Sequence, residues 1–129
     1  MTLVAFLIGR FIFGAFFAWH GFDHVRREQM MTQYARMKRV PAPQTAVLAS
    51  GLMLMAGGVS IIAGYQSDIG VALLVIFLVV SSFFMHNFWA VADPQARSFE
   101  RVNFEKNMAL AGAALSLLAI PRPWPFGIG

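Results

Sequence analysis

Two long runs without a charged side chain, separated by only four residues, constrain this chain more than any other feature. Residues 45–64 and 69–91 contain no Lys, Arg, Asp or Glu. An α-helix rises about 1.5 Å per residue, so about 20 apolar residues cross a hydrocarbon core of about 30 Å. The four intervening residues leave room only for a tight turn. The two runs therefore predict a pair of antiparallel membrane-spanning helices.

Two further segments are predicted to span the membrane. Residues 2–22 are apolar except for Arg10 and His20. They lack the basic start and the small-residue cleavage site of a signal peptide, so we expect them to remain as the first span. Near the end of the chain, the run 108–120 has 13 uncharged residues, too few to cross a membrane alone. The fourth span must borrow polar residues upstream and is placed at residues 101–120.

The composition favours a membrane protein over a soluble one. Hydrophobic residues make up 58% of the 129 residues and charged residues 12%, whereas a soluble domain carries about 25% charged residues. The fold class predicted for residues 1–129 is therefore a single all-α membrane domain, a bundle of four transmembrane helices. The chain has no cysteine, which excludes disulfides, thiolate-bound metal and dithiol chemistry of its own.

A polar segment between the first two spans has helical periodicity. Met30, Tyr34 and Met37 recur at i, i+4 and i+7 and form one face, with basic residues on the other faces. This pattern predicts a short amphipathic helix at the membrane interface, with a plain basic loop as the alternative. The basic residues of this segment are Arg26, Arg27, Arg36, Lys38 and Arg39.

The distribution of basic residues predicts the orientation of the chain. The first loop has five Lys or Arg and the third loop has two, while the second loop has none and the tail has one. The positive-inside bias therefore places the first and third loops in the cytoplasm and both termini outside. The net charge of +4 is assigned to contact with anionic membrane lipids and not with nucleic acid.

Polar side chains within or beside the spans gather at one membrane face. With four spans, the end of the first, the end of the third and the start of the fourth meet there, with Arg10 approaching from the opposite side. Ionisable groups inside a membrane are costly unless paired, so such a cluster indicates a functional pocket; the alternative is that they only link helices by hydrogen bonds. The candidate polar pocket comprises Arg10, His20, Asp23, His24, His86, Asn87, Glu105, Lys106 and Asn107.

A quinone site is the first chemical interpretation of this pocket. A quinone needs an apolar slot, donors for its two carbonyl oxygens and a titratable group that moves protons. His24, His86 and Lys106 would supply the donors, and Glu105 or Asp23 would carry the proton. The candidate aromatic wall is Phe84, Trp89 and Phe104, with Phe83 and Phe88 beside them; the alternative for each is a core or lipid-facing side chain.

Two other interpretations stay open. His20 and His24 lie one helical turn apart and His86 arrives from another span, a set that would suit a metal or haem, but this spacing is unspecific and we do not favour it. Alternatively, the protein is a non-catalytic scaffold that docks a soluble partner through its basic first loop. The chain has neither a nucleotide-binding glycine loop nor a nucleophile with a nearby base, so an autonomous enzyme is not expected.

Small residues four apart predict close packing of the spans, because they let helix backbones approach. Together with Gly57 and Gly58 in the second span, they favour a tight bundle. The pairs are Ala5 and Gly9, Gly14 and Ala18, Ala109 and Ala113, and Gly112 and Ser116.

Several motifs together resemble the DoxX family of small four-span bacterial membrane proteins. The most specific is Phe104-x-Lys106-Asn107-Met108-Ala109-Leu110, followed by Gly112. The other spans match in Arg10, Gly14, Gly21, His24, Gly51, the Gly57–Gly58 pair and His86-x-x-Trp89. The sequence departs from the family pattern at His24, where lysine is common, and at Leu54, where an acidic residue is common. A proton relay through that acidic position is therefore not expected here.

The resemblance implies an integral, multi-pass protein of the bacterial cytoplasmic (inner) membrane. Some DoxX-like proteins are subunits of quinone-linked oxidoreductases and others belong to oxidative-stress complexes, so it implies an accessory subunit of a redox system. Quinone is the cofactor that this implies, while haem and metal are disfavoured. The implied partners are membrane lipids, other redox-complex subunits or a second copy of the chain.

Overall fold

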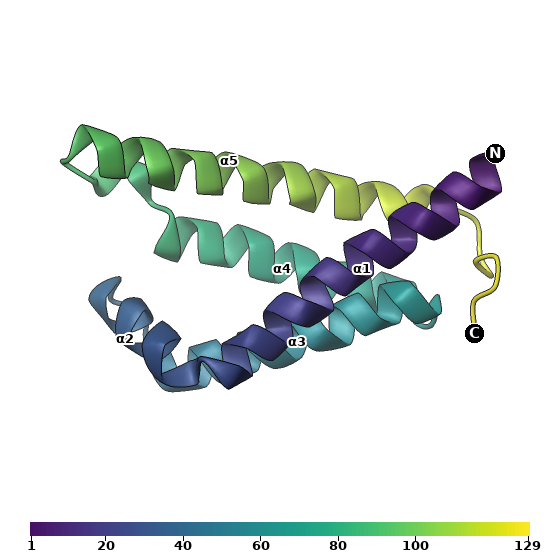
Figure 1. Cartoon of the computed structure of the whole chain (residues 1–129), viewed down its shortest axis with the longest axis horizontal. Coiled ribbons are helices and arrows are strands. Elements are labelled where there is room, and N and C mark those ends of the chain that lie inside the picture. The colour runs from purple at the N-terminus through teal and green to yellow at the C-terminus, as the bar shows by residue number, and fades with distance from the viewer.

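The computed structural model describes residues 1–129, and every regular element in it is a helix (Figure 1). This confirms the all-α fold class. The five α-helices are α1 (Thr2–Arg26), α2 (Glu28–Met37), α3 (Pro43–Ala63), α4 (Ser67–Met85) and α5 (Pro94–Ser116). Two short 3₁₀ helices follow α4 and α5, namely η1 (Phe88–Ala90) and η2 (Leu117–Ala119).

The long helices pack in a row, with α1 against α3, α3 against α4, and α4 against α5. Helix α5 runs back alongside α4, and both chain termini lie at the end of the bundle opposite α2 (Figure 1). The end of α1, the start of α3, the end of α4 and the start of α5 therefore share the α2 end. This is the juxtaposition on which the predicted polar pocket depends.

Three helical segments are long and apolar enough to cross a membrane: Thr2–Arg26, Pro43–Ala63 and Ser67–Ala90. Helix α5 is not among these segments, because its first half is polar and exposes Arg101, Glu105 and Lys106. The three apolar spans of the predicted bundle are thus present.

The boundaries of the last two long helices differ from the predicted spans. Helix α4 ends at Met85 and the chain then turns through η1, whereas residue 91 was the expected end. Helix α5 begins at Pro94, seven residues before the expected start at 101. Its start is defined by a local signal, because the Asp93 carboxylate accepts a hydrogen bond of 2.8 Å from the Ala96 amide and proline occupies the first turn.

Glycines set the contact between α1 and α3. A Cβ atom added to Gly14 would lie 2.6 Å from the carbonyl oxygen of Gly58, and one added to Gly58 would lie 2.5 Å from the amide nitrogen of Ala18. About two turns further along, a Cβ on Gly21 would lie 2.6 Å from the carbonyl oxygen of Gly51. The backbones are therefore in direct contact, as the small-residue spacing in these two spans predicted.

The other small-residue pairs do not pack within the chain, so that part of the packing prediction is wrong. Added Cβ atoms at Gly9 and Gly112 would meet no atom within 4 Å. Their partners Ala5 and Ser116 are exposed, and so are both members of the third pair, Ala109 and Ala113. Spacing alone therefore does not tell which face of a span another helix covers.

The α1–α3 contact predicts a clear contrast between two substitutions in one helix. Gly14→Ala places a methyl group against the α3 backbone, and overpacking of this kind costs about 1–3 kcal/mol. Gly9→Ala fills open space and improves helix propensity, so it should be neutral or stabilise by up to about 1 kcal/mol. Unfolding in mixed detergent micelles, monitored by circular dichroism, measures both. Equal losses for the two variants would contradict the close approach.

Candidate functional site

A cavity of about 660 Å³ lies at the α2 end of the bundle. The end of α1, helix α2, the first half of α3 and the second half of α4 form its walls, and 14 of its 19 lining residues are hydrophobic. Its size falls within the range of about 300–1,000 Å³ that is typical of small-molecule pockets. The lining side chains with hydrogen-bonding groups are His24, Tyr34, Ser50, Ser81 and His86.

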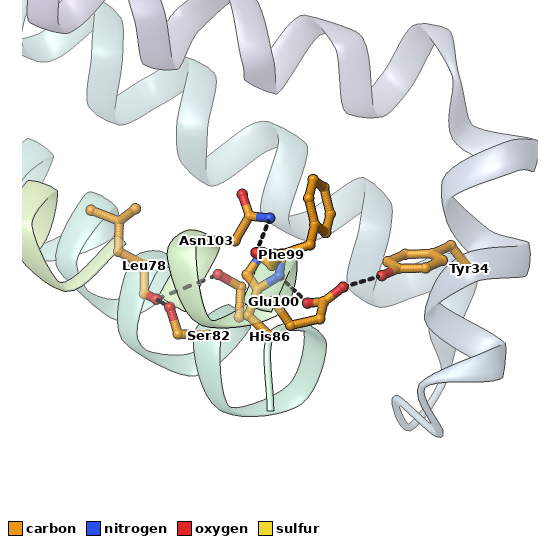
Figure 2. A network of polar contacts seen from close by, with 8 residues as sticks. Tyr34, Leu78, Ser82, His86, Phe99, Glu100 and Asn103 are labelled. Carbon is orange, nitrogen blue, oxygen red and sulfur yellow. Dashed lines mark hydrogen bonds and ion pairs between the residues drawn. The ribbon is translucent and has the colours of Figure 1, made fainter. Parts of the chain in front are cut away.

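A buried carboxylate joins three helices at one side of this cavity. Glu100, in the second turn of α5, is 7% exposed. Its Oε1 accepts a hydrogen bond of 3.0 Å from the Tyr34 hydroxyl of α2, and its Oε2 lies 2.7 Å from Nδ1 of His86. Figure 2 shows the carboxylate of Glu100 between the rings of Tyr34 and His86. Both oxygens of the carboxylate are therefore engaged.

Local structure explains why these groups meet. His86 is the C-cap of α4, where its backbone amide donates a hydrogen bond of 3.1 Å to Ser82 and the helix stops. The chain then reverses through η1, and Asp93 starts α5. Glu100 consequently returns to the level of His86.

The sequence prediction missed Glu100. Residue 100 lies just outside the fourth span predicted at residues 101–120, in the predicted third loop. The Asp93–Pro94 pair is the sequence signal that would have revealed Glu100, because Asp followed by Pro is typical of a helix start. A helix that starts there has Glu100 on the same face as the buried Asn107 and Ala111.

His24 occupies a second polar position in the cavity. Its Nδ1 lies 2.9 Å from the hydroxyl oxygen of Ser50 and 3.3 Å from the carbonyl oxygen of Val47, both on α3. The Ser50 hydroxyl itself donates to the Val47 carbonyl at 2.9 Å. The close approach of Gly21 and Gly51 brings α1 near enough to α3 for this contact.

The other predicted pocket residues near this end lie outside the cavity. His20 is exposed and stacks on Phe16, with ring centroids 4.3 Å apart. Asp23 pairs with Arg26 at 2.7 Å. Asn87 is partly buried and occupies the N-cap position of η1, without a capping hydrogen bond from its side chain.

The polar residues predicted on the fourth span also lie outside the cavity lining. Glu105 forms an exposed ion pair of 2.7 Å with Arg101, one turn earlier on α5. Lys106 is exposed, and Asn107 is buried against the bundle. Of the nine predicted pocket residues, the structure brings only His24 and His86 into the cavity.

Arg10 lies at the opposite end of the bundle and holds the C-terminal tail. Its Nη1 donates a hydrogen bond of 2.7 Å to the carbonyl oxygen of Pro125. Its guanidinium group also sits 5.7 Å from the ring centroid of Phe6 and 5.8 Å from that of Trp124. This buried arginine therefore ties α1 to the tail.

The predicted aromatic wall divides into two groups. Phe84 lines the cavity. Trp89 and Phe104 instead pack against each other, with centroids 5.7 Å apart, in a cluster that includes Phe83 and Phe88 and joins η1 to α4 and α5. This cluster holds the His86 turn against α5 and does not form a wall of the cavity.

The histidines do not form a metal site. His24 and His86 line the cavity, but His20 does not. The structure contains no group of three His, Cys, Asp or Glu side chains placed to hold a metal ion.

Residues 5–87 match the protein family described as DoxX. The chain belongs to the DoxX family. The match covers α1 through α4 and reaches His86, so it includes both histidines of the cavity. In this DoxX protein, α5 and its Glu100 lie beyond the matched residues. No curated protein and no solved structure matches the chain.

The surroundings of Leu54 suit an apolar side chain and not the acidic residue that the resemblance implies for this position. This side chain is 1% exposed and belongs to the central hydrophobic cluster with Phe17, Leu74 and Leu78. An ionised carboxylate here would be costly, since a buried charge needs a partner. In this DoxX chain the position is part of the core.

Tyr34 provides a titration that reports on the site. Burial, with the Glu100 hydrogen bond as the second cause, raises the pKa of its phenol to about 12 from 10.0. Because the folded pKa lies above the unfolded one, the burial and hydrogen bonding of the neutral phenol contribute their full stability below pH 10, and that stability is lost as the pH rises toward 12. In a Tyr65→Phe variant, Tyr34 is the only tyrosine. Its absorbance at alkaline pH should show a midpoint near 12 in the folded protein and near 10 in denaturant; equal midpoints would contradict the contact.

Proposed function

We propose that this DoxX protein is an accessory membrane subunit of a quinone-linked redox system, and that its cavity holds the head group of a lipophilic quinone. The cavity is the observation that carries the proposal. It combines an apolar lining with a few polar groups, His24, Tyr34 and His86, at defined positions. Sites for small apolar ligands have this composition, because burial supplies affinity and the few polar groups fix orientation.

The proposal includes a membrane arrangement. Helix α5 would serve as the fourth span, lying beside α4 over a similar length (Figure 1). Helix α2 would lie at the cytoplasmic interface of the bacterial inner membrane, with both termini outside, since the basic residues cluster around α2. The cavity would then open near the depth of the lipid head groups, where a quinone ring enters from the bilayer.

Quinone binding to protein in lipid nanodiscs tests the proposal. The probe is a radiolabelled short-chain ubiquinone, measured by scintillation proximity, with a short-chain menaquinone as competitor. Ala49→Phe fills the cavity from α3, and its expected effect is a loss of binding of at least about tenfold. Ala56→Phe is the matched control, because Ala56 is exposed on α3 two turns away and does not line the cavity.

A second pair of variants tests the polar groups. His24→Ala should weaken binding by at least about tenfold, because a bound polar atom loses its partner inside an apolar site. His20→Ala, one turn earlier on α1 and outside the cavity, should bind as the unmodified protein does. If neither quinone binds, or if the control variants lose binding as much as the cavity variants, the quinone proposal is wrong.

A non-catalytic docking function is the second candidate, and the charge around α2 favours it. Arg36 and Arg39 are exposed and form no ion pair, and Lys38 is likewise unpaired. A soluble acidic partner, such as another subunit of a redox complex, would find a positive surface there.

Charge neutralisation separates the two functions. For a docking surface, replacing Arg36, Lys38 and Arg39 with Gln should release a partner that co-purifies with the protein, as detected by quantitative mass spectrometry. His86→Ala should leave that partner bound. Retention of the partner by the triple variant would contradict the docking function.

A further inference from the structure

The polar groups of the cavity carry a pattern of hydrogen-bond polarity that the proposed quinone function does not specify. The Tyr34–Glu100–His86 network uses the hydroxyl of Tyr34 and Nδ1 of His86 (Figure 2). The His24–Ser50–Val47 network uses Nδ1 of His24 and the hydroxyl of Ser50. Those contacts determine which atoms remain for a ligand, and whether the atoms left over donate or accept.

Glu100 determines the free groups of Tyr34 and His86. An ionised carboxylate only accepts hydrogen bonds. The hydrogen of the Tyr34 hydroxyl is therefore committed to Oε1 of Glu100, at 3.0 Å, and a hydrogen on Nδ1 of His86 is committed to Oε2, at 2.7 Å. In a neutral imidazole one nitrogen donates and the other accepts. With Glu100 ionised and His86 neutral, the lone pairs of Tyr34 Oη and His86 Nε2 are left over, and both are acceptors.

His24 also has an acceptor nitrogen left for a ligand, although Glu100 does not contact it. The Ser50 hydroxyl donates its hydrogen to the Val47 carbonyl, so the Ser50 oxygen and the Val47 oxygen both act as acceptors for His24. Nδ1 of His24 lies 2.9 Å from the first and 3.3 Å from the second, so it carries the hydrogen. Nε2 of His24 is the acceptor that remains.

We infer that the cavity selects a ligand that donates hydrogen bonds from hydroxyl groups, and that Glu100 is the positioning residue for this selectivity. Within the quinone function on which this inference rests, the preferred ligand is the dihydroxy form, the quinol. The carbonyl oxygens of a quinone are acceptors only, and would face these three acceptors. The two serine hydroxyl groups of the lining are committed elsewhere, because Ser50 donates to the Val47 carbonyl and Ser81 donates to the Leu78 carbonyl at 3.5 Å. A bound ligand would exclude water from these groups, so a ligand that leaves them without a partner is disfavoured, because each unmade hydrogen bond carries the cost of desolvation.

Three matched ligands test the selectivity without any change to the protein. A short-chain ubiquinol, the corresponding ubiquinone and the quinol dimethyl ether compete anaerobically for the labelled probe. The ether keeps the shape and the oxygen atoms of the quinol but has no hydroxyl hydrogen. The quinol should bind at least about tenfold more tightly than either of the others. Equal affinity of the quinol and the ether would overturn the inference and leave the proposed function intact, whereas no binding of any of them overturns both.

Glu100→Gln tests the positioning role. The amide group of glutamine donates hydrogen bonds, so it can hold a bare Nδ1 of His86 and leave a hydrogen on Nε2, which suits a quinone carbonyl. The preference for quinol over quinone should therefore fall at least about threefold, a change that simple loss of packing would not give. Glu105→Gln is the control, since Glu105 is exposed on the same helix and pairs with Arg101. An unchanged ligand preference in folded Glu100→Gln protein would overturn the role of Glu100.

A spectroscopic measurement keeps the inference testable if Glu100→Gln does not fold. In unmodified protein with ¹⁵N-labelled histidine, solid-state NMR distinguishes protonated from bare ring nitrogens. His24→Ala and His86→Ala samples assign the signals. Both histidines should be protonated at Nδ1 and bare at Nε2; a hydrogen on Nε2 of either one at neutral pH would overturn the assignment of acceptors.

Discussion

The backbone contact between α1 and α3 is the constraint on which the site depends. Gly14 and Gly58, and then Gly21 and Gly51, leave no space for a Cβ atom between the two helices. In a lipid environment the hydrophobic effect does not drive helices together, so close van der Waals contact over small residues carries more of the association. The same approach sets His24 beside Ser50 and thereby forms one side of the cavity.

On the other side of the cavity, a buried carboxylate holds the helices together. Glu100 connects α5 to α2 through Tyr34 and to α4 through His86. Such a group is expensive to bury alone, but both of its oxygens have partners here. The first half of α5 is too polar for the helix to be recognised as a membrane span. The Glu100 hydrogen bonds and the contact between Phe83 and Phe104 hold that half against the bundle.

The lining of this cavity lies entirely within the matched family segment, but the carboxylate that contacts two of its side chains does not. Helices α1 to α4 supply the walls and both histidines, within the DoxX match of residues 5–87. Glu100, which orients Tyr34 and His86, comes from the α5 segment beyond that match. The hydrogen bonding of the cavity side chains therefore depends on the whole bundle, because the carboxylate that contacts Tyr34 and His86 comes from α5.

The sequence by itself determined the all-helical class, the three apolar spans, the helix between the first two of them and the meeting of polar residues at one end, because these follow from the length, periodicity and charge of local segments. Tertiary structure decided which residues form the cavity. Glu105 and Lys106 turned outward, Trp89 and Phe104 packed on each other, and Glu100 turned inward. The reason is physical: periodicity fixes which residues share a helix face, but only packing against other helices decides which face is covered.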